Sequence, residues 1–136
     1  MQEAIAQAAL RHLGTPFVLG RRDVGRALDC VGLILVVARE LQLPVLEPPA
    51  YSLRQMLRST AQETAIQCGL TQKHELVLSS DVVLLEMITE RHFHFGIVCG
   101  DLVVHACDRR KRVVSDPFTN CFDSRVRGVF TWPKPF

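Results

Sequence analysis

The sequence predicts an α+β domain in which helices come first and an antiparallel sheet follows. Two observations lead to this fold class. Apolar residues recur at helical spacing in the first half of the chain, whereas the part after Ser79-Ser80-Asp81 consists of short β-rich segments separated by turns. A run of helices followed by a run of strands is typical of α+β domains, with the N-terminal helices packed on the C-terminal sheet.

The helices are placed by periodic apolar residues and by the signals at their ends. The first is expected over residues 3–13, because Gly14-Thr15-Pro16 stops its pattern. An irregular loop with several glycines and arginines follows over residues 17–27. Asp29 is then a favoured N-cap residue for a second helix, which ends near residue 41. A third, more polar helix is expected between Leu53 and Gly69.

The strands are placed by β-branched and aromatic residues between turn signals. Those expected are Val82–Met87, His92–Cys99, Leu102–Cys107, Arg112–Ser115 and Val126–Trp132.

Length and composition limit the classes of function. The 136 residues, 48% of them hydrophobic, suffice for one core, so we expect a single domain over residues 1–136. The net charge is only +2, which argues against a nucleic-acid partner. No apolar run approaches the roughly 20 residues that cross a bilayer, and a basic signal-peptide region is missing. We therefore expect synthesis in the cytoplasm and no membrane insertion.

Cys30 is the candidate nucleophile. It follows the N-cap residue Asp29, and the free N–H groups and dipole at a helix start stabilise a thiolate and can also hold an oxyanion. The other cysteines lack such a context and form no CxxC pair; they are Cys68, Cys99, Cys107 and Cys121. A cysteine packed under a helix would have the same local sequence, so the hypothesis needs a base elsewhere in the chain.

Two histidines can supply that base and its orienting partner. If the chain turns at Gly100-Asp101 in a type II′ hairpin, Cys99 pairs with Leu102 and Gly96 lies opposite His105. His94 and His105 then become diagonal neighbours on one face, with His94 as general base and His105 as its orienter. A loop one residue longer or shorter would turn His105 to the other face.

Two alternatives from other classes remain open at this point. Histidines are also common zinc ligands, so His92, His94, His105 and Cys107 could form the site of a zinc-dependent hydrolase. The chain could also be a catalytically inactive binding module. The thiol hypothesis requires no metal and no other cofactor.

Four ordered segments resemble the NlpC-type papain-like cysteine peptidases. They are Gly14-Thr15-Pro16-Phe17, Asp29-Cys30-Val31-Gly32-Leu33, His94-Phe95-Gly96-Ile97-Val98 and Val104-His105-Ala106. The resemblance implies a papain-like core and hydrolysis of amide bonds in peptidoglycan peptides of the bacterial cell wall. It assigns the nucleophile to Cys30, the base to His94 and the orienting residue to His105.

The resemblance also implies contacts with the substrate and a route to it. The residues expected to line the substrate site are Phe17, Asp29, Val31 and His92. Phe17 stands where the family usually has tyrosine and Val31 where it has serine, which leaves substrate preference open. Because no secretion signal is recognised, we expect a phage-like particle to deliver the domain to the wall, with phage tail proteins as partners. A toxin-like effector and an intracellular amidase are the alternatives.

Overall fold

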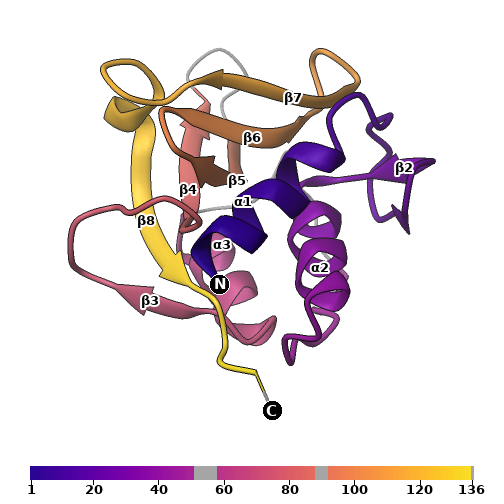
Figure 1. The fold of residues 1–136 in the computed structure, drawn as a ribbon, viewed down its shortest axis with the longest axis horizontal. Coiled ribbons are helices and arrows are strands. Elements are labelled where there is room, and N and C mark those ends of the chain that lie inside the picture. Colours follow the sequence, from indigo (N-terminus) through magenta and orange to yellow (C-terminus); the bar gives the residue numbers. More distant parts are fainter. Residues whose placement is uncertain (51–57, 88–91, 136) are drawn as a thin grey trace.

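The structure, a computed structural model, describes residues 1–50, 58–87 and 92–135 (Figure 1). Its helices are α1 (Gln2–Arg11), α2 (Cys30–Glu40) and α3 (Arg58–Gln67), with a 3-10 turn η1 (Phe122–Arg125). Its strands are β1 (Arg22–Asp23), β2 (Ala27–Leu28), β3 (Thr71–Lys73), β4 (Val82–Met87), β5 (His92–Cys99), β6 (Leu102–Cys107), β7 (Arg112–Pro117) and β8 (Val126–Thr131). The predicted α+β class is confirmed.

The main sheet has six strands in the order β3-β8-β4-β5-β6-β7, and every neighbouring pair is antiparallel. β4 to β7 follow one another as a meander, so the centre of the sheet forms by local pairing. β8 returns along the other edge of β4. β5 therefore lies between β4 and β6, inside the sheet.

Both faces of the sheet are buried, by two different sets of residues. Successive side chains of a strand point to opposite faces. On β5, Phe95 and Ile97 belong to the larger cluster, which contains the apolar residues of α1, α2 and α3. Val98 belongs to a smaller cluster, whose buried members are Val83, Leu85, Met87, Val98, Val103 and Phe118. The sequence predicted only the face that the helices cover.

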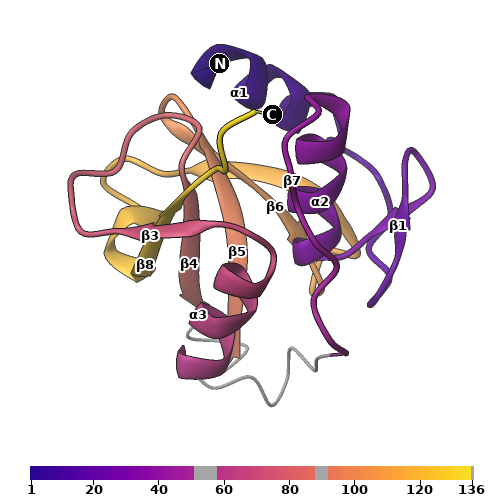
Figure 2. The ribbon, with the colours of Figure 1, turned by 90° about the horizontal axis from the view of Figure 1, so that it is seen from below.

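Helix α2 lies at the centre of the larger cluster. Every residue from Cys30 to Ala38 is buried, which is the pattern of a helix packed on all sides rather than of a surface helix with one apolar stripe. α2 contacts β5, β6 and α1, and Figures 1 and 2 both show α1 and α2 side by side. The start of α2 is thereby held against the sheet.

Two segments differ from expectation, and a third is described only in part. The loop predicted over residues 17–27 contains the short antiparallel strand pair β1–β2. Strand β3 was not predicted; its polar residues form a strand because they pair with β8 at the edge of the sheet. The described part of the third helix begins at Arg58, and the predicted start at Leu53 lies outside the described residues.

A search of the described helices for one that is both long and apolar enough to cross a bilayer finds none.

Candidate active site

Helix α2 begins at Cys30 because Asp29 caps it. Asp29 has an extended backbone, with φ of −104° and ψ of −173°, and its carboxylate Oδ1 accepts a hydrogen bond from the N–H of Gly32 at 2.7 Å. This is the side-chain-to-N3 bond of a capped helix. The predicted N-cap is confirmed, and it fixes Cys30 as the first helical residue.

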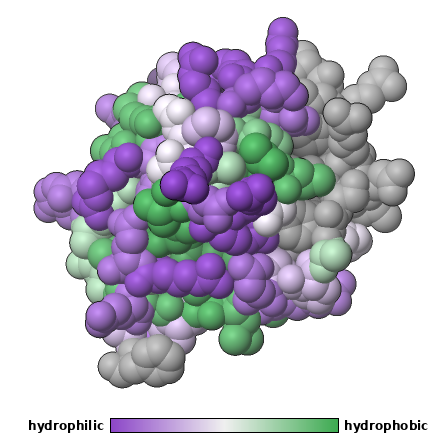
Figure 3. Space-filling view, turned by 90° about the vertical axis from the view of Figure 1, so that its right-hand side faces the viewer, coloured by the Kyte–Doolittle hydropathy of each residue, from purple (hydrophilic) through white to green (hydrophobic). Residues whose placement is uncertain are grey.

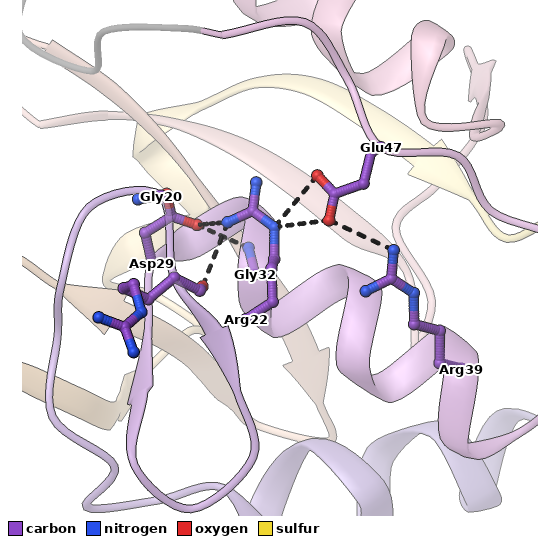
Figure 4. Close-up of polar contacts among 7 residues, drawn as sticks. Gly20, Arg22, Asp29, Gly32, Arg39 and Glu47 are labelled. Atoms are coloured by element: carbon purple, nitrogen blue, oxygen red, sulfur yellow. Dashed lines mark hydrogen bonds and ion pairs between the residues drawn. The ribbon is translucent and has the colours of Figure 1, made fainter.

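The carboxylate of Asp29 is fully buried and has further partners (Figure 4). Its Oδ2 accepts from the N–H of Gly20 at 2.7 Å, and Oδ1 also accepts from Nη1 of Arg22 at 2.8 Å. Arg22 Nε in turn donates to Glu47 at 3.2 Å, and Arg39 donates to the same glutamate at 3.3 Å. The helix start is thus tied to the β1–β2 segment by a buried ion pair.

Gly32 is required by this close packing. A Cβ at position 32 would lie 2.4 Å from the backbone oxygen of Arg21 and 3.2 Å from Oδ1 of Asp29. Contacts under 3.0 Å with backbone cannot be relieved by turning a side chain. The glycine therefore allows the chain around Arg21 to approach the first turn of α2.

The Cys30 thiol is protonated in this environment. Burial raises its pKa from the ordinary 9.0 to about 12, and the negative charge of Asp29 raises it further. The backbone N–H groups of Phe95 and Val31 and the charge of Arg22 act in the opposite direction. The sequence predicts that the helix start lowers this pKa. That expectation is wrong for this structure, because burial and Asp29 outweigh the helix terminus.

The two histidines meet as the hairpin register predicted. Cys99 pairs with Leu102 and Gly96 with His105. Gly100 has a φ of +62° and Asp101 does not have a positive φ, the combination that a type II′ turn requires. The rings of His94 and His105 stack with their centroids 4.9 Å apart and their planes 27° apart. Both side chains are almost completely buried.

His105 has partners that were not predicted from the sequence. Its Nε2 lies 2.6 Å from Oδ2 of Asp116, on β7. Arg110 donates to both carboxylate oxygens of Asp116, with Nη1 3.2 Å from Oδ1. The ring of Phe122 lies against His105 with centroids 5.5 Å apart. Asp116 therefore forms the outer end of a hydrogen-bonded chain that begins at His105.

Cys30 and the histidines approach the same end of the β5–β6 ladder. The ladder between these strands begins at the pair Gly96 and His105. The thiol lies by the N–H of Phe95, which stands between His94 and Gly96 in the sequence. Cys30 belongs to the larger cluster, whereas His105 packs on Phe122 beside the smaller one. The thiol and the rings thus come from the two faces of the sheet, and transfer of the thiol proton to His94 stays a prediction.

The other predicted site residues have structural contacts. Phe17 is half-buried and donates its N–H to the oxygen of Lys111 at 2.9 Å. Val31 is 1% exposed and Asp29 is 0% exposed, so neither is on an open surface. His92 begins β5, opposite Met87, and its side chain lies outside the described structure. Contact of these four residues with a substrate stays a prediction.

The described donor groups do not form a zinc site. Among the described side chains, which do not include that of His92, no three of the metal-binding types come together at ligand spacing. Nε2 of His105 is engaged by Asp116, and the sulfur of Cys107 accepts from the N–H of Arg110 at 3.4 Å. The described residues therefore give the zinc alternative no support.

The site is closed to solvent. Cys30, His94 and His105 are each at most 1% exposed. The outer face on the side of β1 and β2 is mainly hydrophilic, with smaller hydrophobic areas (Figure 3). Val18, Leu19 and Val24, in and next to this strand pair, are 43%, 51% and 62% exposed. A substrate can reach the thiol only after covering groups move aside.

Comparison with known proteins finds likeness in structure and none in sequence. No protein-family model and no curated protein matches the chain. NlpC2 from Trichomonas vaginalis superposes with a TM-score of 0.69 at 18% identity, over 98% of this chain and 47% of that one. The NlpC/p60 domain of the peptidoglycan hydrolase SagA superposes with a TM-score of 0.60 at 17% identity, over 96% of this chain and 98% of the domain.

A third structure, an N-acetylmuramoyl-L-alanine amidase from Bacteroides uniformis, gives a TM-score of 0.54 at 13% identity, over 98% of this chain and 100% of that one. This chain spans less than half the length of NlpC1 and NlpC2 from Trichomonas vaginalis. The order of its helices and strands and its superposition on these structures show that the chain has the α+β, papain-like fold of the NlpC/P60 proteins.

Proposed function

We propose that this chain is a cysteine-dependent hydrolase that cleaves an amide bond in peptidoglycan peptides. One observation carries the proposal: a cysteine begins the capped central helix and lies by the strand residue that follows His94, whose ring stacks on a second histidine. The fold supports a wall substrate, since a peptidoglycan hydrolase and an N-acetylmuramoyl-L-alanine amidase are among its structural neighbours.

The proposed reaction has two stages. His94 takes the proton from Sγ of Cys30, and the thiolate attacks the amide carbonyl carbon to form a tetrahedral oxyanion. N–H groups at the start of α2 are the donors available to that oxyanion. Protonated His94 then gives its proton to the departing amine, which leaves a thioester on Cys30. Water, deprotonated by His94, hydrolyses the thioester and restores the thiol.

The raised pKa of Cys30 affects how the proton moves. A thiol with a pKa of about 12 is not a thiolate at neutral pH, so attack depends on a base that removes the proton when the substrate is bound. Bound substrate also displaces the groups that cover Cys30. The resting structure is therefore an unreactive form of the site.

The same burial favours a second candidate, a catalytically inactive binding module of this fold. The Cys30 thiol is 0% exposed and lies beside Asp29. A cysteine that has lost its catalytic role would have the same surroundings. The two candidates differ in a measurable way, because the module binds peptidoglycan fragments without changing their mass.

Digestion of defined peptidoglycan fragments by the full chain tests the proposal, with the products identified by mass spectrometry. Wild type should release one amide-cleavage product, and Cys30→Ser should release none. Cys121→Ser is the matched control, because Cys121 is an exposed free cysteine, and it should keep wild-type activity. Cleavage that persists in Cys30→Ser contradicts the thiol mechanism, and binding without cleavage by wild type supports the inactive module.

Delivery to the wall by a phage-like particle, with tail proteins as partners, is part of the proposal. It rests on the resemblance in the sequence, and co-purification of the chain with such particles would test it.

A further inference from the structure

Asp116 stands behind His105 on the side away from His94. β6 pairs with β7 so that His105 lies opposite Val114, which makes Asp116 a diagonal neighbour of His105 on the same face. The distance of 2.6 Å between Nε2 and Oδ2 is that of a short, charge-assisted hydrogen bond. His105 itself is 0% exposed, so water does not compete for this contact.

The carboxylate is held in its ionised form. The hydrogen bond from His105 holds the pKa of Asp116 well below its usual range, with Arg110 acting in the same direction against the effect of partial burial. An ionised carboxylate can only accept hydrogen bonds. Nε2 of His105 must therefore carry a hydrogen and donate it to Asp116.

This assignment leaves the other ring nitrogen as an acceptor. A neutral imidazole has one N–H and one lone pair, so Nδ1 of His105 carries the lone pair. That nitrogen is buried and has no hydrogen-bond partner within the described part of the chain. The ring of His94 stacks on His105 with its centroid 4.9 Å away, so the ring of His94 must turn out of this stack before one of its N–H groups can reach Nδ1.

We propose that Asp116, clamped by Arg110, is a positioning residue that holds His105 as the Nε2–H tautomer, so that Nδ1 is kept as the acceptor for an N–H of His94. The inference rests on the proposed function for its effect on rate. The donors then run in one direction, from His94 through His105 to Asp116. When His94 gains the thiol proton, the negative charge of Asp116 stabilises the cation through His105.

Arg110 fixes the orientation of the Asp116 carboxylate. It contacts both oxygens of Asp116 and comes from the turn between β6 and β7. A carboxylate bound on both oxygens cannot rotate away from His105. Arg110→Lys should keep part of this clamp, and Arg110→Met should lose it.

The test uses histidine side-chain NMR on the ¹⁵N-labelled full chain without substrate at pH 8, because ring nitrogen shifts report the tautomer. His105 in wild type should be protonated on Nε2 alone, and Asp116→Asn should give a mixture, since an amide can donate or accept. Asp108→Asn is the matched control; Asp108 lies in the same β6–β7 hairpin but pairs with Lys111. This variant should keep the wild-type tautomer.

Kinetics on peptidoglycan fragments provide the second readout. Asp116→Asn should lower kcat roughly 10- to 100-fold with KM little changed, as expected for a residue that acts through another. Asp116→Glu should recover part of the rate. Wild-type His105 protonated on Nδ1, or an Asp116→Asn variant with the tautomer and kcat of Asp108→Asn, would overturn the inference. If Cys30→Ser proves fully active, the proposed function fails, while the NMR result still decides the role of Asp116.

Discussion

An aspartate–arginine pair stands behind each end of the candidate site, and the two pairs have different neighbours. Asp29 and Arg22 lie beside the thiol, and the charge of Asp29 raises the pKa of Cys30. Asp116 and Arg110 lie beside His105, whose Nε2 is 2.6 Å from the carboxylate. The same two residue types therefore lie beside a thiol at one end and beside an imidazole ring at the other.

The two carboxylates also differ in burial. The carboxylate of Asp29 is 0% exposed and is occupied by the N–H groups of the chain and by Arg22, so its main effect is on the fold. The side chain of Asp116 is 16% exposed and its strongest contact is a titratable ring. The comparison suggests that Asp29 governs stability and Asp116 governs proton transfer, and the following predictions test that division.

Removal of the base should have the largest effect. His94→Ala leaves no group to accept the thiol proton or to protonate the amine, so kcat should fall by about 10³ or more, which corresponds to roughly 4 kcal/mol. His105→Ala should lower kcat less than His94→Ala does. His105→Asn should lower kcat less than His105→Ala does, because an amide can still orient the base. Steady-state kinetics with the same fragments would measure all three.

The double variant distinguishes a relay from two independent groups. His94→Ala/His105→Ala should be scarcely slower than His94→Ala alone, because residues that act as one unit are not additive. Losses that add would show that His105 works separately from His94.

Asp29→Ala should have the next largest effect, and on stability. It removes the cap of α2 and deprives Arg22 of its buried partner, so the free energy of unfolding should fall by about 3 kcal/mol. Urea denaturation followed by circular dichroism would measure it. Asp23→Ala is the control, because Asp23 pairs with Arg21 on the surface, where such a pair contributes under about 1 kcal/mol. Equal losses in the two variants would show that the buried network does not stabilise the helix start.

Alkaline pH should destabilise the protein through Cys30. Because the pKa of this thiol is about 12 in the folded chain against an ordinary 9.0, its stabilising contribution is complete below pH 9 and is lost as pH rises toward 12. Within that window it should reduce the free energy of unfolding by up to about 1.4 kcal/mol per pH unit. The free energy of unfolding of Cys30→Ala should change less with pH than that of wild type. That of Cys121→Ala should change with pH as in wild type. Equal slopes in wild type and Cys30→Ala would mean that the thiol is not held neutral by folding.

The smallest expected effect is on labelling order. Limiting iodoacetamide at pH 7 should modify the exposed Cys121 before the buried Cys30. Addition of a substrate fragment should increase the rate at Cys30, if binding uncovers it. Fastest labelling of Cys30 in the free protein would show that the resting thiol is more ionised than its surroundings indicate.

The parts of the site that local sequence determines were predicted. Asp29 caps its own helix, and the Gly100-Asp101 turn sets the register that brings His94 to His105. Asp116 was missed because the predicted strand ended at Ser115, one residue short, although extension of the same register across the next turn would have found it. Arg22 was missed because its contact with Asp29 depends on how a loop folds back.

The pKa of Cys30 could not be predicted from the helix start alone. A sequence shows that a cysteine follows an N-cap residue, but it does not show that α2 is buried on every side. Burial and the capping charge act on the same sulfur as the helix dipole and outweigh it. Each of these effects depends on packing that forms only in the folded chain.

Detection of the covalent intermediate tests the central claim most directly. Wild type mixed with a peptidoglycan fragment and quenched in acid within milliseconds to seconds should gain the mass of the acyl part of that fragment, and peptide mapping should place it as a thioester on Cys30. His94→Ala should accumulate little or none of it, because the thiol is not deprotonated. Hydrolysis that proceeds without an acyl group on Cys30, or an acyl group on another residue, would contradict the account.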